Sequence, residues 1–212
     1  MRISIRGRVL LVSACILAGT IAWAQQPQSS AKQQAVFADL AVTFAPEHAE
    51  LVPGMCCFWM KGIGADAALT FWKGLGISAN LTGEHASNYI PGYDVNKITL
   101  QAGPRYTYTA WASDASSKAT PRFQIFGEGL FGGIHAFNGV FPTSSGTTSS
   151  AGSYAIQAGG GLDVFFFRNY GVRLLEADYV RTALPNGASN IQNDLRLAFG
   201  VTYHIGSVFH RR

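Results

Sequence analysis

Apolar and polar residues alternate along the stretch Asn193–Gly206, close to the end of the chain. Every second residue is apolar and the residues between are mostly small or polar; the apolar set is Leu195, Leu197, Phe199, Val201, Tyr203 and Ile205. This period of two is typical of a β-strand with one apolar and one polar face. The apolar face carries no charge and includes a Tyr toward its end, as a lipid-facing band would. The stretch is long enough to cross a membrane, for which a tilted strand needs about 9–11 residues.

The same alternation recurs in seven further stretches, so the sequence predicts eight strands. The other predicted strands are Val36–Phe44, Phe58–Phe71, Leu75–Glu84, Lys97–Thr109, Arg122–Ala136, Ser153–Phe167 and Val172–Thr182. Eight is the smallest common strand number in outer-membrane barrels. We therefore predict an all-β fold, namely an eight-stranded antiparallel up-and-down transmembrane β-barrel. Pro104 lies inside one predicted strand and removes a ladder hydrogen bond, so we expect a bulge or distortion there.

The predicted connectors alternate in length, as in an up-and-down barrel. Four are long, namely Ala45–Met55, Ala86–Asn96, Phe137–Gly152 and Ala183–Gln192. Trp72–Gly74 and Arg168–Gly171 are tight turns, and Ala110–Pro121 is a longer turn on the same side. With the N-terminus in the periplasm, the four long loops lie outside the cell.

A water-soluble barrel is the main alternative, because it shows the same alternation with its apolar face turned inward. Here the polar faces hold mostly Gly, Ala, Thr, Ser and Gln and hardly any Lys. A water-facing exterior would carry many more charges. Small side chains also suit the narrow lumen of an eight-stranded barrel, so the pattern favours the membrane barrel.

The N-terminal segment has the features of an export signal. Residues 1–24 contain three Arg, an apolar run and then Ala22-Trp23-Ala24, which predicts a cleaved secretory signal peptide. Val12–Cys15 resembles a bacterial lipobox, but the apolar run continues past Cys15. Residues 25–34 are rich in Gln and Ser and predict a flexible leader, and residues 35–212 form the predicted barrel domain. Export and membrane-crossing strands together predict a location in the bacterial outer membrane.

The composition supports a membrane barrel and excludes some partners. Charged residues make up 13% of the chain, compared with about 25% in soluble domains. Removing the three Arg of the predicted signal peptide from 16 basic residues leaves 13, against 12 acidic ones. This balance gives no reason to expect nucleic acid as a partner. The pattern of residues also predicts no cofactor and no metal site, and the adjacent Cys56 and Cys57 imply no disulfide framework.

Several short motifs, in this order, resemble the small outer-membrane β-barrels of the OmpA/OmpX-like superfamily, of the type common in acidobacteria. They are Gly103-Pro104-Arg105-Tyr106, Phe131-Gly132-Gly133, Gly159-Gly160-Gly161-Leu162-Asp163, Asp178-Tyr179 and Asn193-Asp194-Leu195-Arg196. The resemblance implies an eight-stranded barrel with a polar, largely plugged interior. Its expected partners are outer-membrane lipid, lipopolysaccharide and the barrel-assembly machinery, and we expect a monomer. Two features depart from the pattern: no peptidoglycan-binding domain is expected, and three residues follow the aromatic Phe209.

Charged residues recur on the predicted inner face. The candidate lumen residues are Asp39, Asp66, Glu84, Arg105, Glu128, Asp163, Glu176, Asp178 and Arg196. Buried charges need partners, so we expect a structural network of ion pairs that fills the lumen. The alternative is an ion pair that exchanges partners to open a narrow pore, in which the excess of carboxylates would favour cations. Arg173 is expected at the end of its strand.

The segment Glu84–Asn88 contains His-x-Ser-Asn, which is similar to the His/Ser pair of the outer-membrane lipid A 3-O-deacylases. His85 and Ser87 share one face of a strand, as a Ser nucleophile and its base require. The next strand, near Thr99, offers no outward carboxylate to orient the His. We therefore expect no catalytic residues and a non-enzymatic barrel with a structural or surface-interaction role. A narrow cation-preferring pore is the first alternative, and a deacylase-like hydrolase using His85 and Ser87 is the second.

Overall fold

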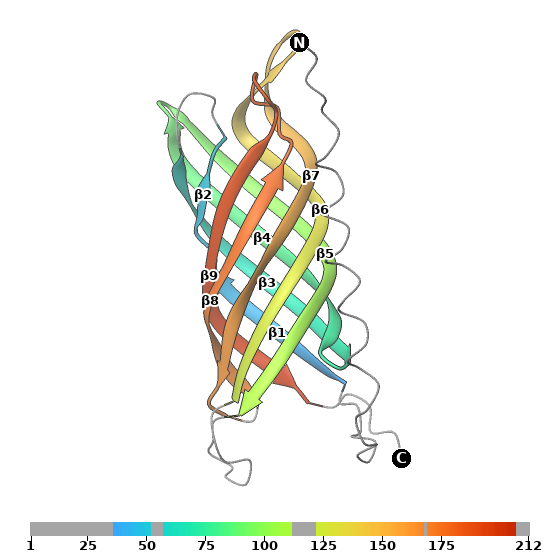
Figure 1. Cartoon of the computed structure of the whole chain (residues 1–212). Coiled ribbons are helices and arrows are strands. Elements are labelled where there is room, and N and C mark those ends of the chain that lie inside the picture. Colours follow the sequence, from blue (N-terminus) through green and yellow to red (C-terminus); the bar gives the residue numbers. More distant parts are fainter. Residues whose placement is uncertain (1–35, 52–56, 112–121, 168, 207–212) are drawn as a thin grey trace, which may run out of the picture. The chain divides into compact units, whose positions relative to one another are not determined.

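The computed structural model describes residues 36–51, 57–111, 122–167 and 169–206. The predicted signal peptide and the predicted leader lie outside the described residues. In the part of the chain that is described, no helix is long and apolar enough to cross a membrane. The secondary structure consists of antiparallel strands (Figure 1).

The strands form one closed sheet. They are β1 (Phe37–Phe44), β2 (Glu47–Ala49), β3 (Phe58–Trp72), β4 (Leu75–Ile90), β5 (Tyr93–Trp111), β6 (Arg122–Thr143), β7 (Gly146–Phe165), β8 (Tyr170–Thr182) and β9 (Gln192–Ile205). Each strand from β3 to β8 pairs with the next one along the chain, and β1 closes the ring by pairing with both β3 and β9. The predicted up-and-down barrel is thereby confirmed.

The ring has eight strand positions, although the described residues contain nine strands. β2 pairs with the same two neighbours as β1, so it continues β1 toward the other end of the barrel. The break lies at Ala45 and Pro46, and Pro46 lacks the N–H group that a ladder needs. The main chain stays attached across the break, because Ala45 N donates to Gly62 O and Leu197 N donates to Pro46 O. The prediction of a loop over the whole of Ala45–Met55 was therefore wrong for Glu47–Ala49.

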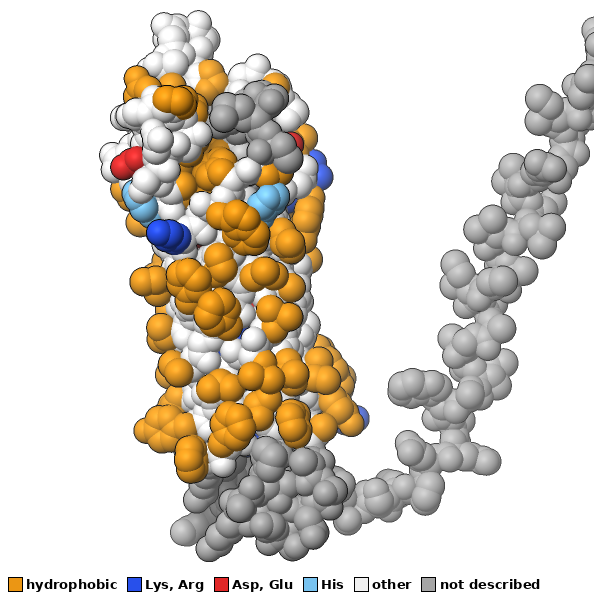
Figure 2. Space-filling model, turned by 90° about the vertical axis from the view of Figure 1, so that its left-hand side faces the viewer, with side chains coloured by type: hydrophobic (Ala, Val, Ile, Leu, Met, Phe, Trp, Pro, Cys, Tyr) orange, Lys and Arg blue, Asp and Glu red, His pale blue; other side chains and the backbone are white. Residues whose placement is uncertain are grey.

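The outer wall is apolar and the interior is polar, as alternation along each strand requires. Ile63, Phe131 and Val201 are each more than 60% exposed on the outside. On the inner face, Thr99 and Asp163 are fully buried. Figure 2 shows hydrophobic side chains over the middle of the wall, with most charged and His side chains of this face toward one end. This is the reverse of a water-soluble barrel, and it fits a wall that faces hydrocarbon.

The strands are longer than predicted at the end of the barrel where the long connectors lie. The predicted loops Ala86–Asn96 and Phe137–Gly152 were wrong, because both are mostly strand. The β4–β5 hairpin turns after Ile90, where Ile90 pairs with Tyr93. The β6–β7 hairpin turns after Thr143, where Thr143 pairs with Gly146. Gly, Ser and Asn are typical of loops, but the partner strand supplies the hydrogen bonds that these residues need to stay extended.

Bulges and turns lie where residues adopt left-handed backbone angles. Asn88 and Asn138, with φ of 55° and 59°, lie at register shifts of the β4–β5 and β6–β7 ladders. Lys73 and Gly74 both have positive φ and form the tight turn between β3 and β4, at the opposite end of the barrel. Ala183–Ile191 remains a loop, as predicted, whereas Ala110–Pro121 lies almost wholly outside the described residues.

Pro104 does not produce the bulge that the sequence predicts. The β4–β5 register runs unbroken through it, from Ile77 opposite Pro104 to Gly76 opposite Arg105. On the other side, the paired positions of β5 and β6 skip Gly103 and Pro104 but resume in the same register. The missing N–H therefore interrupts one ladder locally without moving a side chain to the other face.

The two ends of the barrel are expected to lie on opposite sides of the outer membrane, with the long hairpins outside the cell. Ser145 lies in the β6–β7 turn and Lys73 in the β3–β4 turn, and both are exposed. Ser145→Cys should react with a membrane-impermeant maleimide on intact cells, and Lys73→Cys should react only after the outer membrane is opened. The unsubstituted chain measures the background from Cys56 and Cys57. The reverse labelling pattern would contradict the orientation.

Candidate functional site

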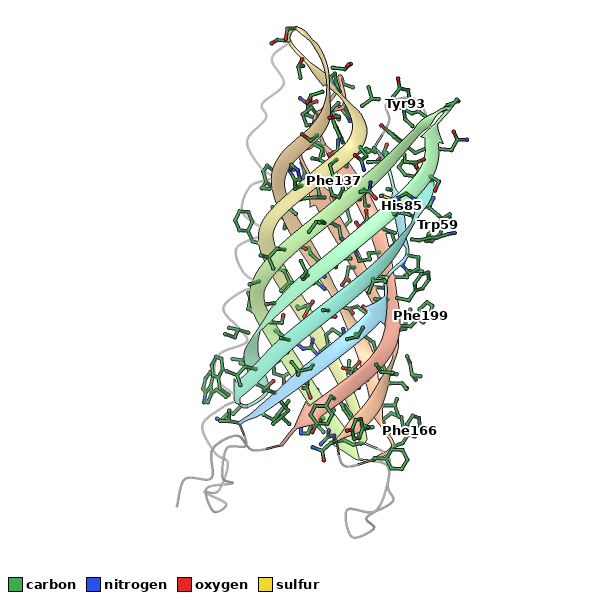
Figure 3. All side chains as sticks on the ribbon, turned by 180° about the vertical axis from the view of Figure 1, so that it is seen from behind. Trp59, His85, Tyr93, Phe137, Phe166 and Phe199 are labelled. Atoms are coloured by element: carbon green, nitrogen blue, oxygen red, sulfur yellow. The ribbon has the colours of Figure 1, made fainter. Side chains whose placement is uncertain are left out.

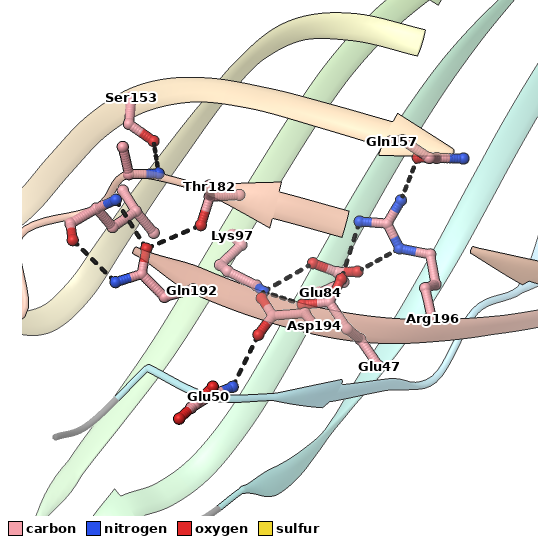
Figure 4. A network of polar contacts seen from close by, with 12 residues as sticks. Glu47, Glu50, Glu84, Lys97, Ser153, Gln157, Thr182, Gln192, Asp194 and Arg196 are labelled. Carbon is pink, nitrogen blue, oxygen red and sulfur yellow. Dashed lines mark hydrogen bonds and ion pairs between the residues drawn. The ribbon is translucent and has the colours of Figure 1, made fainter. Parts of the chain in front are cut away.

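The lumen holds two networks of buried charges. The upper network, toward the long hairpins, joins Lys97 and Arg196 to three carboxylates (Figure 4). Lys97 Nζ contacts a carboxylate oxygen of Glu47 and lies 3.6 Å from Glu84 Oε2 and 3.5 Å from Asp194 Oδ2. These side chains come from β2, β4, β5 and β9, so the contacts cross the lumen.

Arg196 connects the upper network to the opposite wall. Its Nε donates to Glu84 Oε1 at 2.9 Å, and its two terminal nitrogens donate to Glu47 Oε2 at 3.0 Å and to Gln157 Oε1 at 3.1 Å. Gln157 is on β7, which is not a neighbour of β9. All of these side chains are buried. Each of the three guanidinium nitrogens of Arg196 therefore donates to a protein oxygen in place of water.

The lower network is built around Arg173. Its guanidinium donates to Asp163 Oδ1 at 2.9 Å, to Glu176 Oε2 at 2.6 Å and to Asp66 Oδ2 at 3.2 Å. Arg105 Nη1 lies 3.4 Å from Glu128 Oε2, which also accepts a hydrogen bond from Ser78 at 2.9 Å.

The ring of Phe126 contacts both Arg of the lower network. The guanidinium carbons of Arg105 and Arg173 lie 3.6 Å and 4.6 Å from its centroid. Phe126 is buried and inward-facing, so both contacts are cation–π contacts made away from water.

A β-bulge explains why the sequence placed Arg173 wrongly. The predicted alternation along β8 puts Arg173 out of phase with Glu176, and we expected it at the end of the strand. The β8–β9 register shifts between Arg173 and Glu176, and the two residues between, Leu174 and Leu175, are both more than 50% exposed. The extra outward residue reverses the phase, so Arg173 and Glu176 both face the lumen. Arg173 therefore lies inside the barrel.

All nine candidate lumen residues named from the sequence are buried inside the barrel. Asp39 lies at the lower end, where its Oδ1 is 2.6 Å from His204 Nδ1. Asp178 is also buried, and no hydrogen bond or ion pair involves it in the described part of the chain. Five further members were not predicted from the sequence, namely Glu47, Lys97, Arg173, Asp194 and His204. Strict alternation could have found Lys97, Asp194 and His204, whereas Glu47 lay in a predicted loop.

Carboxylates outnumber bases in the described part of the lumen. Nine buried carboxylates face Lys97, Arg105, Arg173 and Arg196, with His204 beside Asp39. Oxygens of Asp66, Glu128 and Glu176 lie within 4.8 Å of one another, a spacing that a metal ion could bridge. Arg173 already contacts two of these three carboxylates and Arg105 contacts the third. The cluster is therefore a set of ion-pair partners for Arg, and it does not favour a metal.

An apolar cluster lies above the upper network, inside the end that carries the long hairpins. Its buried members are Ala49, Leu51, Met60, Ala86, Tyr89, Val95, Ile134, Ala136, Phe141, Ala155 and Leu184. Along the strands these follow the charged positions directly: Ala49 comes two residues after Glu47, and Ala86 two after Glu84. Tyr89 Oη accepts a hydrogen bond from Val140 N at 2.9 Å, which ties the β4–β5 hairpin to β6.

The second candidate site is an exposed polar group on the outer face. His85 Nε2 lies 2.9 Å from Ser87 Oγ, so these two residues meet as the sequence suggested. His85 Nδ1 lies 2.9 Å from Asn96 Oδ1, and the register pairs His85 directly with Asn96. Figure 3 places His85 on the outer side of the sheet, on the same side of the barrel as Trp59. The sequence pattern indicated the region near Thr99 as the place for this third group and did not predict Asn96.

One tautomer of His85 serves both contacts: with the hydrogen on Nδ1, Nδ1 donates to Asn96 Oδ1 and Nε2 accepts from the Ser87 hydroxyl. This is the order of a nucleophile, a base and an orienting group. The third group is a neutral amide, however, so it stabilises the imidazolium that proton transfer would create less than a carboxylate would.

Comparisons with known proteins identify the fold. No protein-family model matches the chain, and no curated protein matches it. Among solved structures, Neisserial surface protein A is 14% identical with a TM-score of 0.54, and the match covers 81% of this chain and 99% of that one. Ail, the attachment invasion locus protein of Yersinia pestis, is also 14% identical with a TM-score of 0.50, covering 82% of this chain and 99% of that one. The chain has the fold of the small outer-membrane β-barrels of the OmpA/OmpX-like kind.

Proposed function

We propose that the chain is an integral outer-membrane barrel with a plugged lumen and a structural or surface-interaction role, and that it is not an enzyme. The observation that carries the proposal is the set of ion pairs and hydrogen bonds that crosses the lumen, from Glu47 on β2 to Gln157 on β7 by way of Arg196. A transport path would need this space. Opening such a path would separate buried charges from their partners. A buried charge without a partner is strongly unfavourable, so we expect the lumen to stay closed.

The two ends of the lumen support the same proposal. At the hairpin end, the apolar cluster around Tyr89 and Phe141 lies over the ion pairs. At the other end, His204 contacts Asp39, and the rings of Phe37 and Phe165 lie 5.1 Å and 5.6 Å from the ring of His204. Polar groups in the middle therefore lie between an apolar cluster at one end and the ring contacts of His204 at the other.

The surface-interaction part of the proposal rests on the long hairpins. β6 and β7 extend to a turn at Ser144 and Ser145, with exposed Ser, Thr and Gly along β7. Hydroxyl-rich strands of this kind can present hydrogen-bond donors and acceptors to a partner without exposing a large apolar patch. Ail, named for attachment, was solved in complex with the heparin analogue sucrose octasulfate.

A narrow cation-preferring pore is the alternative, favoured by the excess of buried carboxylates. Gln101 lends it some support, because neither polar atom of its buried amide has a hydrogen-bond partner in the described part of the chain. Water could satisfy that amide, and a line of water could carry ions.

Planar-bilayer recording separates the plugged barrel from the pore. We expect the inserted protein to give no steady current, because the ion pairs and the apolar cluster occupy the lumen. A steady cation-selective current that Glu47→Gln reduces would favour the pore. Glu50→Gln is the control, because Glu50 is exposed and lies three residues from Glu47.

Arginine substitutions test the buried network. Arg173→Ala and Arg105→Ala should each lower the free energy of unfolding by about 3–5 kcal/mol, because they leave buried carboxylates without a partner. Arg122→Ala is the matched control, since Arg122 is half-buried and its main contact is the ring of Phe165, 4.3 Å away. That contact is worth about 0.5–1 kcal/mol. Equal urea midpoints for the three variants in lipid vesicles would mean that the network does not stabilise the barrel.

A lipid hydrolase is the second candidate function, favoured by the contacts of His85 with Ser87 and Asn96. We expect the purified protein to release no fatty acid from lipid A in a Ser87-dependent way. In a serine protease, an Asn in the third position lowers the rate about 10⁴-fold. Ser87→Ala should also fold normally, within about 0.5 kcal/mol, as a surface change does. Release of a 3-hydroxy fatty acid that stops with Ser87→Ala, but not with the exposed control Ser150→Ala, would establish the hydrolase.

A further inference from the structure

The outer face of β3, β4 and β5 contains a groove of about 510 Å³, inside the usual size range of ligand sites. The side chains of Ile63 and Ile98 form its walls, and Gly83 lies between them. The register places these three residues in one row, because Ile63 pairs with Gly83 and Gly83 pairs with Ile98. The groove therefore exists because the middle position of an otherwise apolar row has no side chain.

Packing does not explain Gly83. A Cβ atom added there would meet nothing within 4 Å. At Gly62 and Gly103, by contrast, a Cβ would lie 2.3 Å and 2.1 Å from a main-chain oxygen, so those glycines allow close approach of the backbone. Glycine weakens a strand, and an exposed strand position without steric demand favours a larger residue. An open groove on the lipid-facing wall is the structural consequence of this glycine.

The end of the groove nearer the hairpins is polar and cationic. Lys61 pairs with His85, and His85 pairs with Asn96, so these three outward residues form the next row. Lys61 is exposed, and no carboxylate contacts it in the described part of the chain. Ser87 adds a hydroxyl beyond His85. The row offers a positive charge and several hydrogen-bonding groups directly above an apolar groove.

Aromatic residues place this polar row at the membrane boundary. Trp59 is 57% exposed, and its ring lies 5.1 Å from that of His48. Figure 3 shows Trp59 close to His85, on the outer side of the barrel. Trp side chains, which have one polar edge, favour the interface between hydrocarbon and headgroups. The groove then runs from the headgroup level into the hydrocarbon.

We propose that this groove binds one acyl chain of a lipopolysaccharide molecule, with a phosphate of its headgroup on Lys61 and its hydroxyl groups on His85, Asn96 and Ser87. The charge of Lys61 complements an anionic headgroup, and the apolar walls complement the chain below it. The polar row lies at the end that the hairpins place outside the cell, so the ligand belongs to the outer leaflet. The inference rests on the proposed outer-membrane location and adds a specific lipid site to it.

A second groove on the same wall supplies the control. It measures about 520 Å³ and lies further from the hairpins, between Leu40, Ile77, Ala79 and Ala102. No charged residue lines it. Ala79 is exposed on β4, four residues before Gly83 and on the same face. Ala79→Leu therefore fills an equivalent space without touching the proposed site.

Native mass spectrometry of the full chain in phosphatidylcholine nanodiscs tests the site, with purified lipid A added as the probe. We expect one tightly retained lipid A per barrel. Gly83→Leu should abolish the retained species by filling the groove, and Lys61→Gln should weaken it roughly fivefold by removing one charge. Ala79→Leu and Lys73→Gln, which removes an exposed charge at the opposite end, should leave retention unchanged.

Three outcomes would overturn the site: equal retention in all five proteins, equal weakening by Lys61→Gln and Lys73→Gln, or equal retention of phosphatidylglycerol in place of lipid A. The last result would assign the groove to glycerophospholipids. Heat-dependent gel mobility and β-sheet circular dichroism of each nanodisc sample report insertion separately. Failure to insert would contradict the proposed function, whereas normal insertion without retained lipid A contradicts this site alone.

Discussion

Arg196 extends from β9 into the lumen, where its guanidinium meets oxygens from β2, β4 and β7 within 3.1 Å. A charge removed from water needs such partners, and neighbouring strands alone do not supply them here. Arg173 imposes the same requirement lower in the barrel, with partners on β3, β7 and β8. The ion pairs thus join strands that share no ladder, and the cross-section of the barrel depends on them.

The same ion pairs specify the strand register. A slip of one residue would turn every inward charge of a strand toward lipid and every outward apolar residue toward the lumen. On β4, for example, Glu84 faces Arg196 while Gly83 and His85 face outward. The energetic difference between the two registers is therefore large for every strand that carries an inward charge. The bulge at Leu174 and Leu175 is consistent with this, because it brings Arg173 to the carboxylates at the cost of one regular ladder position.

Alternation along the sequence was sufficient to predict the barrel, the strand number and nine buried lumen residues, because each of these depends on one strand at a time. Alternation failed at positions whose orientation or contacts depend on a bulge, a chain break or the pairing of two strands. Arg173 faces inward because of a bulge, and Glu47 does so because β2 resumes after Pro46 between the neighbours of β1. Asn96 meets His85 because two strands pair at that position. The long hairpins were missed because their Gly, Ser and Asn residues are extended only through their partner strands.

The two faces of the wall are therefore under different physical constraints. Inside, each charged side chain depends on several others, so a single change leaves buried groups unpaired. Outside, the side chains face hydrocarbon, which accepts apolar and small side chains without requiring a charged partner. An outward position can then hold a residue that is poor for a strand, such as Gly83, as long as the interior keeps the register. Chemistry that depends on the outer face, in a row such as Lys61, His85 and Asn96, can change without disturbing the ion pairs beneath it.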